Sequence, residues 1–103
     1  MAHFLPSNIE KKLLSSISTH LSAKSPYSVI LFGSYAKGTQ KATSDIDVAI
    51  KGSSPLDLAT WVKIEGSLEE SSIPQKVDVI DYHRVSKEFQ QLIDREGCVL
   101  YLK

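Results

Sequence analysis

Two aspartates separated by one apolar residue are the side chains of this sequence best suited to metal-dependent chemistry. Asp45 and Asp47 flank Ile46 and stand directly before the apolar residues 48–50. If this segment forms a strand, side chains two positions apart point to the same face. Two carboxylates on one face repel each other, and a cation between them relieves the repulsion. Because hard oxygen ligands suit Mg²⁺ or Mn²⁺ and not zinc, the spacing predicts a divalent metal site.

A third carboxylate, Asp78, lies in residues 76–82, where polar and apolar side chains alternate as in a strand. If this strand pairs beside the strand that carries Asp47, Asp78 faces the same site. Three carboxylates together with substrate phosphate oxygens can hold two divalent ions about 3.5–4 Å apart. Asp81 is the rival for this role, and its alternative is to cap the helix that follows.

A polar loop leaves the apolar residues 27–32 and has the composition of a phosphate-binding turn. Gly33 permits positive φ or a close approach of the backbone to a ligand. Ser34 offers a hydroxyl and a backbone N–H near the start of a short helical turn, where anions are favoured. Lys37 and Lys41 either approach phosphates as point charges or belong to a solvated loop.

The remaining polar candidates indicate no second site. The three histidines have no ligand spacing, and Cys98 is the only cysteine, so the sequence predicts no zinc centre. We expect Cys98 to be a buried strand residue, since no basic neighbour marks it as activated. His83 is expected on the surface. Tyr35 either stacks on a nucleotide base or is simply exposed.

Composition narrows the function class. The chain has 103 residues, enough for one small domain, with 12 basic and 12 acidic side chains. This zero net charge argues against a dedicated nucleic-acid binder, which needs cationic side chains to neutralise phosphates. One cysteine permits no intrachain disulfide. No apolar run approaches the roughly 20 residues that span a bilayer, and the first residues lack a secretory pattern. We expect a soluble, cytoplasmic protein.

The elements that must position these residues follow from hydrophobic periodicity. Ser7 as N-cap with Glu10 predicts a capping box, followed by a helix that ends near Ala23. Its apolar stripe recurs every four residues, at Ile9, Leu13, Ile17 and Leu21. Strands are predicted over residues 27–32, 45–51, 76–82 and 98–102, with the first buried on both faces.

Two further helices are expected between these strands. Residues 57–71 place Leu58, Trp61, Val62, Ile64 and Leu68 on one apolar face. A last helix carries Val85, Phe89, Leu92 and Ile93 and closes at Gly97 as C-cap. The resulting order is helix, strand, strand, helix, strand, helix, strand, within one α+β domain over residues 1–103.

The spacing of the loop and the aspartates matches a known signature. A glycine–serine pair, ten intervening residues and a DID triplet beginning at Asp45 resemble the DNA polymerase β-like nucleotidyltransferase superfamily. The stretch GSYAKGTQKATSDIDVAI, which starts at Gly33, is similar to the minimal nucleotidyltransferase (MNT) group within it. VDVID around Asp78 resembles the strand of the family's third carboxylate. The resemblance covers residues 27–82.

This resemblance implies a mixed sheet of about four strands with helices packed on one side. It also implies Mg²⁺-dependent transfer of a nucleoside monophosphate, normally AMP from ATP, onto a hydroxyl. Gly33 and Ser34 would hold the triphosphate, and Asp45, Asp47 and Asp78 would ligate metal. Asp78 would also help to deprotonate the acceptor.

The family also implies a partner. Members of the MNT group resemble antitoxins that adenylylate a tyrosine of a small helical HEPN toxin, so we expect a HEPN-type partner in a hetero-oligomer. Lys37 stands where the family more often has arginine. The lysine keeps the positive charge for the triphosphate but lacks the bidentate fork of a guanidinium group. The alternatives are a non-catalytic module that covers its partner, and an aminoglycoside-type nucleotidyltransferase that acts as a homodimer.

Overall fold

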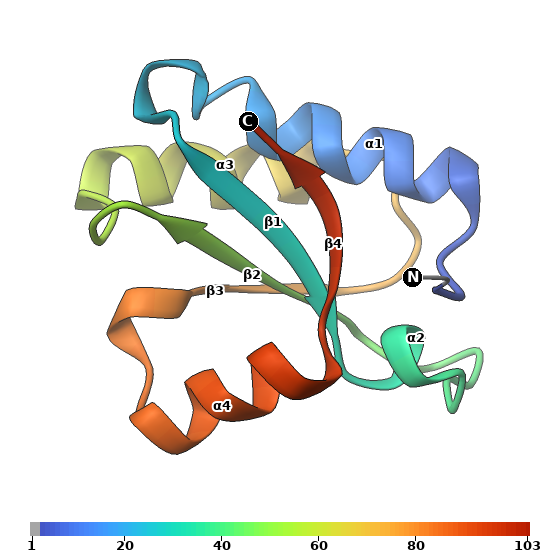
Figure 1. Cartoon of the computed structure of the whole chain (residues 1–103). Helices are drawn as coiled ribbons and strands as arrows, with labels where there is room; N and C mark the ends of the chain where they lie inside the picture. Colours follow the sequence, from blue (N-terminus) through green and yellow to red (C-terminus); the bar gives the residue numbers. More distant parts are fainter. Residues whose placement is uncertain (1–2) are drawn as a thin grey trace.

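A four-stranded mixed sheet forms the centre of the computed structural model, which describes residues 3–103. β1 (Tyr27–Phe32) pairs antiparallel with β2 (Ile46–Gly52) on one side and with β4 (Cys98–Leu102) on the other. β3 (Val77–Asp81) runs parallel to β2, so the spatial order is β3-β2-β1-β4 (Figure 1). The expected α+β class with one mixed sheet is confirmed.

Helices lie on both faces of the sheet (Figure 1). The longest two, α1 (Ser7–Ser18) and α3 (Leu58–Glu70), pack on the face that we call the covered face. The helix α4 (Lys87–Glu96) packs on the opposite face, which we call the open face. The predicted placement of helices on one side is therefore wrong for α4. The shorter helical elements are η1 (Ser22–Lys24), α2 (Ser34–Lys37) and η2 (Tyr82–Arg84).

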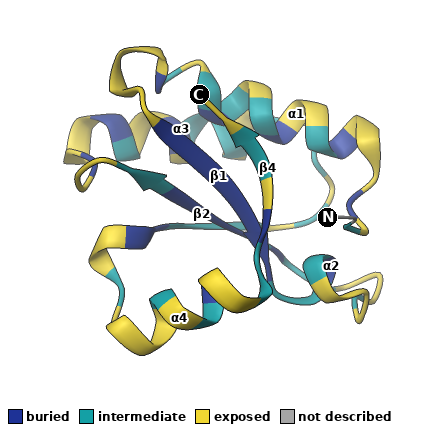
Figure 2. Cartoon of the chain, viewed as in Figure 1, coloured by how far each residue is buried: buried dark blue, intermediate teal, exposed yellow. Residues whose placement is uncertain are grey.

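The covered face contains most of the hydrophobic core. Every residue of β1 is buried, as its continuous apolar run predicts, and β1 is dark blue along its length in Figure 2. The predicted apolar stripe Ile9, Leu13, Ile17 and Leu21 is buried in this core, although Leu21 follows the end of α1. The fully buried side chains of this core include Leu13, Ile17, Leu21, Val29, Leu31, Val48, Ile50 and Ile64.

The open face has a smaller core. Ile30 and Phe32 of β1 gather there with Ala49, Tyr82 and Ile93. The ring of Phe32 also meets Phe89 of α4 edge to face, with 5.7 Å between centroids. The core of this face is thus built around α4 and η2, and Asp47 of β2 and Asp78 of β3 lie outside it.

The first helix begins differently from the prediction. Its N-cap is Pro6 and not Ser7, and no side chain caps it. The Pro6 carbonyl accepts the backbone N–H groups of Ile9 and Glu10 at 3.1 and 2.9 Å. The capping box is absent because the Glu10 carboxylate pairs instead with His3 Nε2, at 3.1 Å. The helix ends at Ser18, before the 3₁₀ turn η1.

The later elements keep their predicted order, with differences in their bounds and exposure. Val85, expected on the last helix, lies before α4, and Tyr82, expected in the third strand, belongs to η2. Leu58 and Val62, expected on the apolar face of α3, are 75% and 57% exposed, because the helix packs through Ile64 at its centre. Gly97 is the C-cap of α4, but with extended backbone (φ −75°). A Cβ there would overlap Ile30 and the carbonyl of Ile93, which explains the glycine. Within residues 3–103, no helix has the length and apolarity to cross a membrane.

Candidate active site

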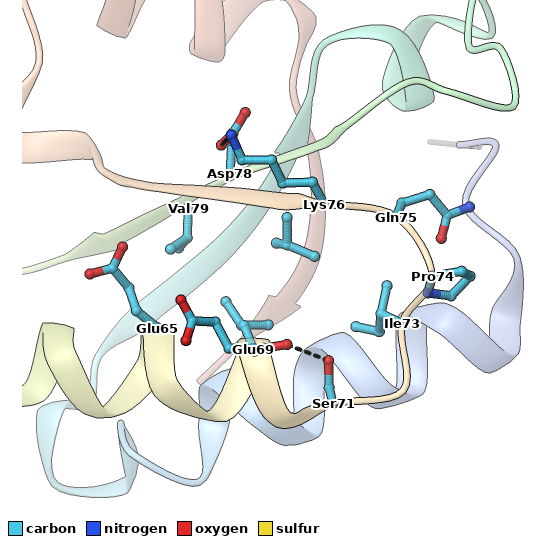
Figure 3. Close-up of a pocket in the computed structure, with 11 residues that line it drawn as sticks. Glu65, Glu69, Ser71, Ile73, Pro74, Gln75, Lys76, Asp78 and Val79 are labelled. Carbon is cyan, nitrogen blue, oxygen red and sulfur yellow. Dashed lines mark hydrogen bonds and ion pairs between the residues drawn. The ribbon is translucent and has the colours of Figure 1, made fainter.

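Asp47 of β2 and Asp78 of β3 lie side by side on the open face. The parallel register pairs these two residues directly. Ile46 and Val48, which flank Asp47 on β2, are in the core of the covered face. Because side chains alternate along a strand, Asp47 points to the open face. Asp78 and Val79 likewise project from opposite sides of β3 (Figure 3). The structure therefore brings together the two carboxylates that the sequence places on separate strands.

The electrostatics of this pair are unfavourable in the protein alone. Burial is the main cause that raises the pKa of Asp47, and the charges of Asp78 and then Asp45 raise it further. Within the described part of the chain, no ion pair forms at Asp47. Asp78 has a partner in Lys76, whose Nζ lies 3.6 Å from Oδ1. Lys76 was missed from the sequence, although a position two residues before Asp78 shares its strand face.

Asp45 lies in the loop just before β2. The predicted strand over residues 45–51 begins one residue later, at Ile46. Asp45 is half-buried, and it is near enough for its charge to raise the pKa of Asp47. The negative charges of Asp45, Asp47 and Asp78 therefore act on one another at this end of β2.

Gly33 brings the backbone against the Asp47 carboxylate. Its φ of +75° is a conformation that L side chains rarely adopt. A Cβ at this position would overlap the Asp47 carboxylate oxygen. The Gly33 carbonyl then accepts the backbone N–H groups of Ala36 and Lys37 at 3.1 and 3.2 Å, which starts α2. Glycine is required here for two reasons, the positive φ and the space that the carboxylate occupies.

Ser34 and Lys37 mark the two ends of α2. Within residues 3–103, the Ser34 hydroxyl makes no hydrogen bond, and the residue is half-buried. Lys37 is exposed, and its Nζ lies 3.5 Å from Oε1 of Glu96 at the end of α4. Glu96 was missed from the sequence, where nothing local links it to the loop. The ammonium group that was expected to contact phosphate is therefore paired with α4.

Asp81, the rival for the third carboxylate, is a structural residue. It belongs to the covered side of β3 and is only 5% exposed. Its Oδ2 accepts the N–H of Leu56 at 2.8 Å, and its Oδ1 accepts the N–H of His83 at 3.0 Å as the cap of η2. Arg84 approaches it at 3.6 Å. Asp81 is thus a cap, but of the 3₁₀ turn η2 and not of the last helix as expected, because the N-cap of α4 is Ser86.

Tyr35 fits neither of its expected roles, because it is buried in the core with α1. Its hydroxyl accepts a hydrogen bond from Gln75 Nε2 at 3.1 Å, and its carbonyl accepts the N–H of Phe4 at 2.9 Å. Cys98 is buried in β4 and His83 is exposed, both as predicted. These contacts tie α2 to the core and leave the base-stacking hypothesis without support.

The donor set suits a magnesium–nucleotide complex more than a protein-only metal cage. Across residues 3–103, no three histidine, cysteine or acidic side chains converge closely enough to hold a metal by themselves. Mg²⁺ is commonly bound through one or two carboxylates, waters and substrate phosphates. Asp47 and Asp78 offer two adjacent carboxylates, and the unpaired charge of Asp47 would be stabilised by a cation. The residues present therefore fit Mg²⁺ that arrives with a phosphate ligand.

Comparison with known proteins agrees with this geometry. The family described as polymerase beta, nucleotidyltransferase matches residues 14–103. A probable protein adenylyltransferase MntA from Haemophilus influenzae is 33% identical over the whole chain and 91% of its own length. The protein adenylyltransferase MntA of Shewanella oneidensis is 35% identical over 71% of the chain, an alignment that spans 52% of that relative.

A solved structure has the same fold. It is a toxin–antitoxin crystal structure with AMP-PNP, and one of its chains superposes with a TM-score of 0.67. The two sequences are 28% identical, and the match covers 86% of this chain and 73% of the other.

Proposed function

The chain belongs to the polymerase beta nucleotidyltransferase family, and from this membership we propose that it transfers AMP from ATP onto a hydroxyl of a partner protein. The observation that carries the proposal is the register pair Asp47–Asp78 beside the glycine turn at Gly33. This arrangement offers carboxylates for a metal and a close backbone approach for a phosphate. The similar proteins named protein adenylyltransferase support AMP as the group transferred and a protein as its acceptor.

The proposed reaction forms one phosphorus–oxygen bond and breaks another. The acceptor hydroxyl oxygen attacks the α-phosphorus of ATP, and the bond from that phosphorus to the bridging oxygen breaks, so pyrophosphate leaves. The hydroxyl proton passes to the Asp78 carboxylate. Asp45, Asp47 and Asp78 are the side chains that would hold Mg²⁺, which when bound neutralises phosphate charge. Most of the acceleration comes from positioning and charge stabilisation.

The triphosphate would lie along the turn at Gly33. The glycine supplies the close backbone approach, and the free Ser34 hydroxyl can donate to a phosphate oxygen. Lys37 stands at the far end of α2 and becomes a phosphate ligand if it leaves Glu96. Its single ammonium group gives a point contact where arginine would give a fork.

The partner we propose is a HEPN-type toxin that this chain inactivates as an antitoxin. Two findings support it: the resemblance of the GS…DID stretch to MNT antitoxins, and the likeness to a chain of a toxin–antitoxin structure with an ATP analogue. In this role, AMP on an acceptor tyrosine would block the toxin.

A direct assay tests the proposal. The purified chain is incubated with ATP, Mg²⁺ and the HEPN protein encoded beside its gene, and the mass of the acceptor is measured. We expect the acceptor to gain one or more AMP units with the wild type and none with Asp47→Asn. Asp57→Asn is the matched control, since Asp57 is an exposed carboxylate at the start of α3. An acceptor that gains no AMP, or gains it equally with Asp47→Asn, contradicts the proposal.

A further inference from the structure

The free edge of β3 is the feature of this molecule that the proposed reaction leaves unexplained. We propose that this edge docks the acceptor, as an extended segment with a hydroxyl residue, a basic residue next to it and an apolar residue further along. The inference rests on the proposed function and adds to it the place and the chemistry of the acceptor. Four features of the described residues support it: the open backbone, the position of Asp78 and two cavities.

The outer side of β3 has backbone groups without a strand partner. β3 is the last strand of the sheet and pairs only with β2. The Lys76 carbonyl accepts the N–H of Ile46 at 2.9 Å, so the backbone of Lys76 is turned toward β2. Because backbone groups alternate along a strand, those of Val77 and Val79 are turned outward. An extended peptide can add to such an edge through main-chain hydrogen bonds.

Alternation also determines which acceptor side chain meets Asp78. A residue of the added strand opposite Asp78 would lie on the open face, with Cβ atoms about 4.5–5.5 Å apart. A diagonal neighbour would be about 7–8 Å away, which is still within reach of an aromatic side chain. A tyrosine hydroxyl delivered in this way arrives beside the carboxylate that is proposed to take its proton. The adjacent acceptor residues then face the covered side.

The first cavity lies on that covered side. Its charged lining residues are Glu65, Glu69, Asp78 and Lys76, and the last two pair with each other, which leaves two carboxylates in excess. It has a volume of about 620 Å³ between the end of α3 and β3. Glu65 and Glu69 project from α3 toward the strand (Figure 3), and both are exposed. Within residues 3–103, neither carboxylate forms an ion pair. A lysine or arginine next to the acceptor hydroxyl residue would enter this cavity and meet two negative charges.

The second cavity continues along the same edge and is apolar. It has a volume of about 490 Å³ and is lined by Leu58, Trp61, Val79, Ile80 and Val85, among others. Leu58, the first residue of α3, is 75% exposed there. An apolar side chain further along the docked segment would cover it. The two cavities thus predict a basic residue toward Val77 and an apolar residue toward Ile80.

Synthetic peptides test this chemistry. Three capped nine-residue peptides carry a central tyrosine: one with flanking arginine on one side and leucine on the other, one with glutamate in place of arginine, and one with prolines beside the tyrosine. AMP transfer is measured by mass with ATP and Mg²⁺. We expect the arginine peptide to react about fivefold more efficiently than the glutamate peptide, since two exposed charge pairs are lost. We expect the proline peptide, which cannot pair with β3, to react least.

Charge reversal on the protein provides the matched arm. We expect Glu65→Lys with Glu69→Lys to reverse the preference between the arginine and glutamate peptides, with unchanged affinity for a fluorescent ATP analogue. Glu88→Lys is the control, because Glu88 is exposed on α4, outside both cavities. Equal transfer to all peptides, or a preference that ignores the reversal, overturns edge docking. Transfer to the HEPN protein but to no peptide also overturns it and leaves the proposed function standing. Transfer to no acceptor overturns both.

Discussion

The two faces of the sheet differ in what they contribute. The covered face buries fully apolar side chains from α1, α3, β1 and β2. The open face has a smaller core around α4, and beyond it lie two adjacent carboxylates. Full burial of one aliphatic side chain stabilises by about 1.5–3 kcal/mol, so several of them outweigh the repulsion of one aspartate pair. One strand pair thus supports both stability and chemistry, because alternate residues belong to different faces.

The largest expected effect is a loss of AMP transfer on changing Asp47 of the open face, without a loss of stability. Asp47→Asn should lower AMP transfer by at least about 10²-fold, the loss typical of removing one charge-stabilising group. Its unfolding temperature should stay equal or rise. The pKa of Asp47 is raised in the folded chain, so folding disfavours the ionised carboxylate, and at neutral pH the uncharged amide removes that cost.

Two measurements on Asp47→Asn test whether activity is lost while stability is kept. AMP transfer is followed by acceptor mass, and stability by thermal unfolding in EDTA, so that no metal contributes. Asp57→Asn removes an exposed carboxylate as the control and should leave transfer unchanged. A clear fall in the unfolding temperature of Asp47→Asn would mean that the carboxylate supports the fold, and the contrast between the faces would fail.

The next largest effect is a loss of stability on removing a buried side chain from the covered face. Leu31, the penultimate residue of β1, is fully buried, and Leu31→Ala should lower the free energy of unfolding by about 3 kcal/mol. Phe89→Ala on α4 removes a larger side chain that is already 37% exposed, and should cost about 1 kcal/mol. Urea titration of both variants measures the difference. Equal costs would show that the two cores contribute equally.

A smaller loss of stability is expected for a substitution of Gly33, which directly follows β1. Gly33→Ala must hold φ near +75° with a methyl group against the Asp47 carboxylate. The strain should cost about 1–3 kcal/mol of unfolding free energy, and displacement of Asp47 should reduce AMP transfer. Gly66→Ala is the control, because nothing lies within 4 Å of a Cβ there and alanine favours a helix. Full transfer by Gly33→Ala would show that the close approach is dispensable.

Much of the fold was readable because buried strands and amphipathic stripes have strong sequence patterns. Residues 27–32 and 98–102 were predicted with the bounds that β1 and β4 show. The errors arose where tertiary contacts override local preference. Glu10 left its predicted cap to pair with His3, and the exposure of Leu58 depends on where α3 crosses the sheet. The first contact is only seven residues apart in the chain but competes with the cap, whereas the second depends on tertiary packing.

The site was predictable to the extent that alternation along strands determines it. Spacing put Asp47 and Asp78 on separate strands, and their register then places them together. The Lys37–Glu96 pair joins residues far apart in the chain, so only the packing of α4 reveals it. Tyr35 was misjudged because a four-residue helix has too short a pattern to show which side is buried. The catalytic roles remain predictions.

The smallest expected effect concerns that same Lys37–Glu96 pair, which joins the phosphate turn to α4. Its charged atoms are 3.5 Å apart, but the lysine side chain is half exposed, so water screens the attraction. A double-mutant cycle of Lys37→Met and Glu96→Gln should give a coupling free energy of unfolding below about 1 kcal/mol. Glu96→Gln should lower KM for ATP about twofold, because the freed lysine can turn to the triphosphate. If KM rises instead, Glu96 holds Lys37 in its working position, and the open face is preorganised by α4 before any nucleotide binds.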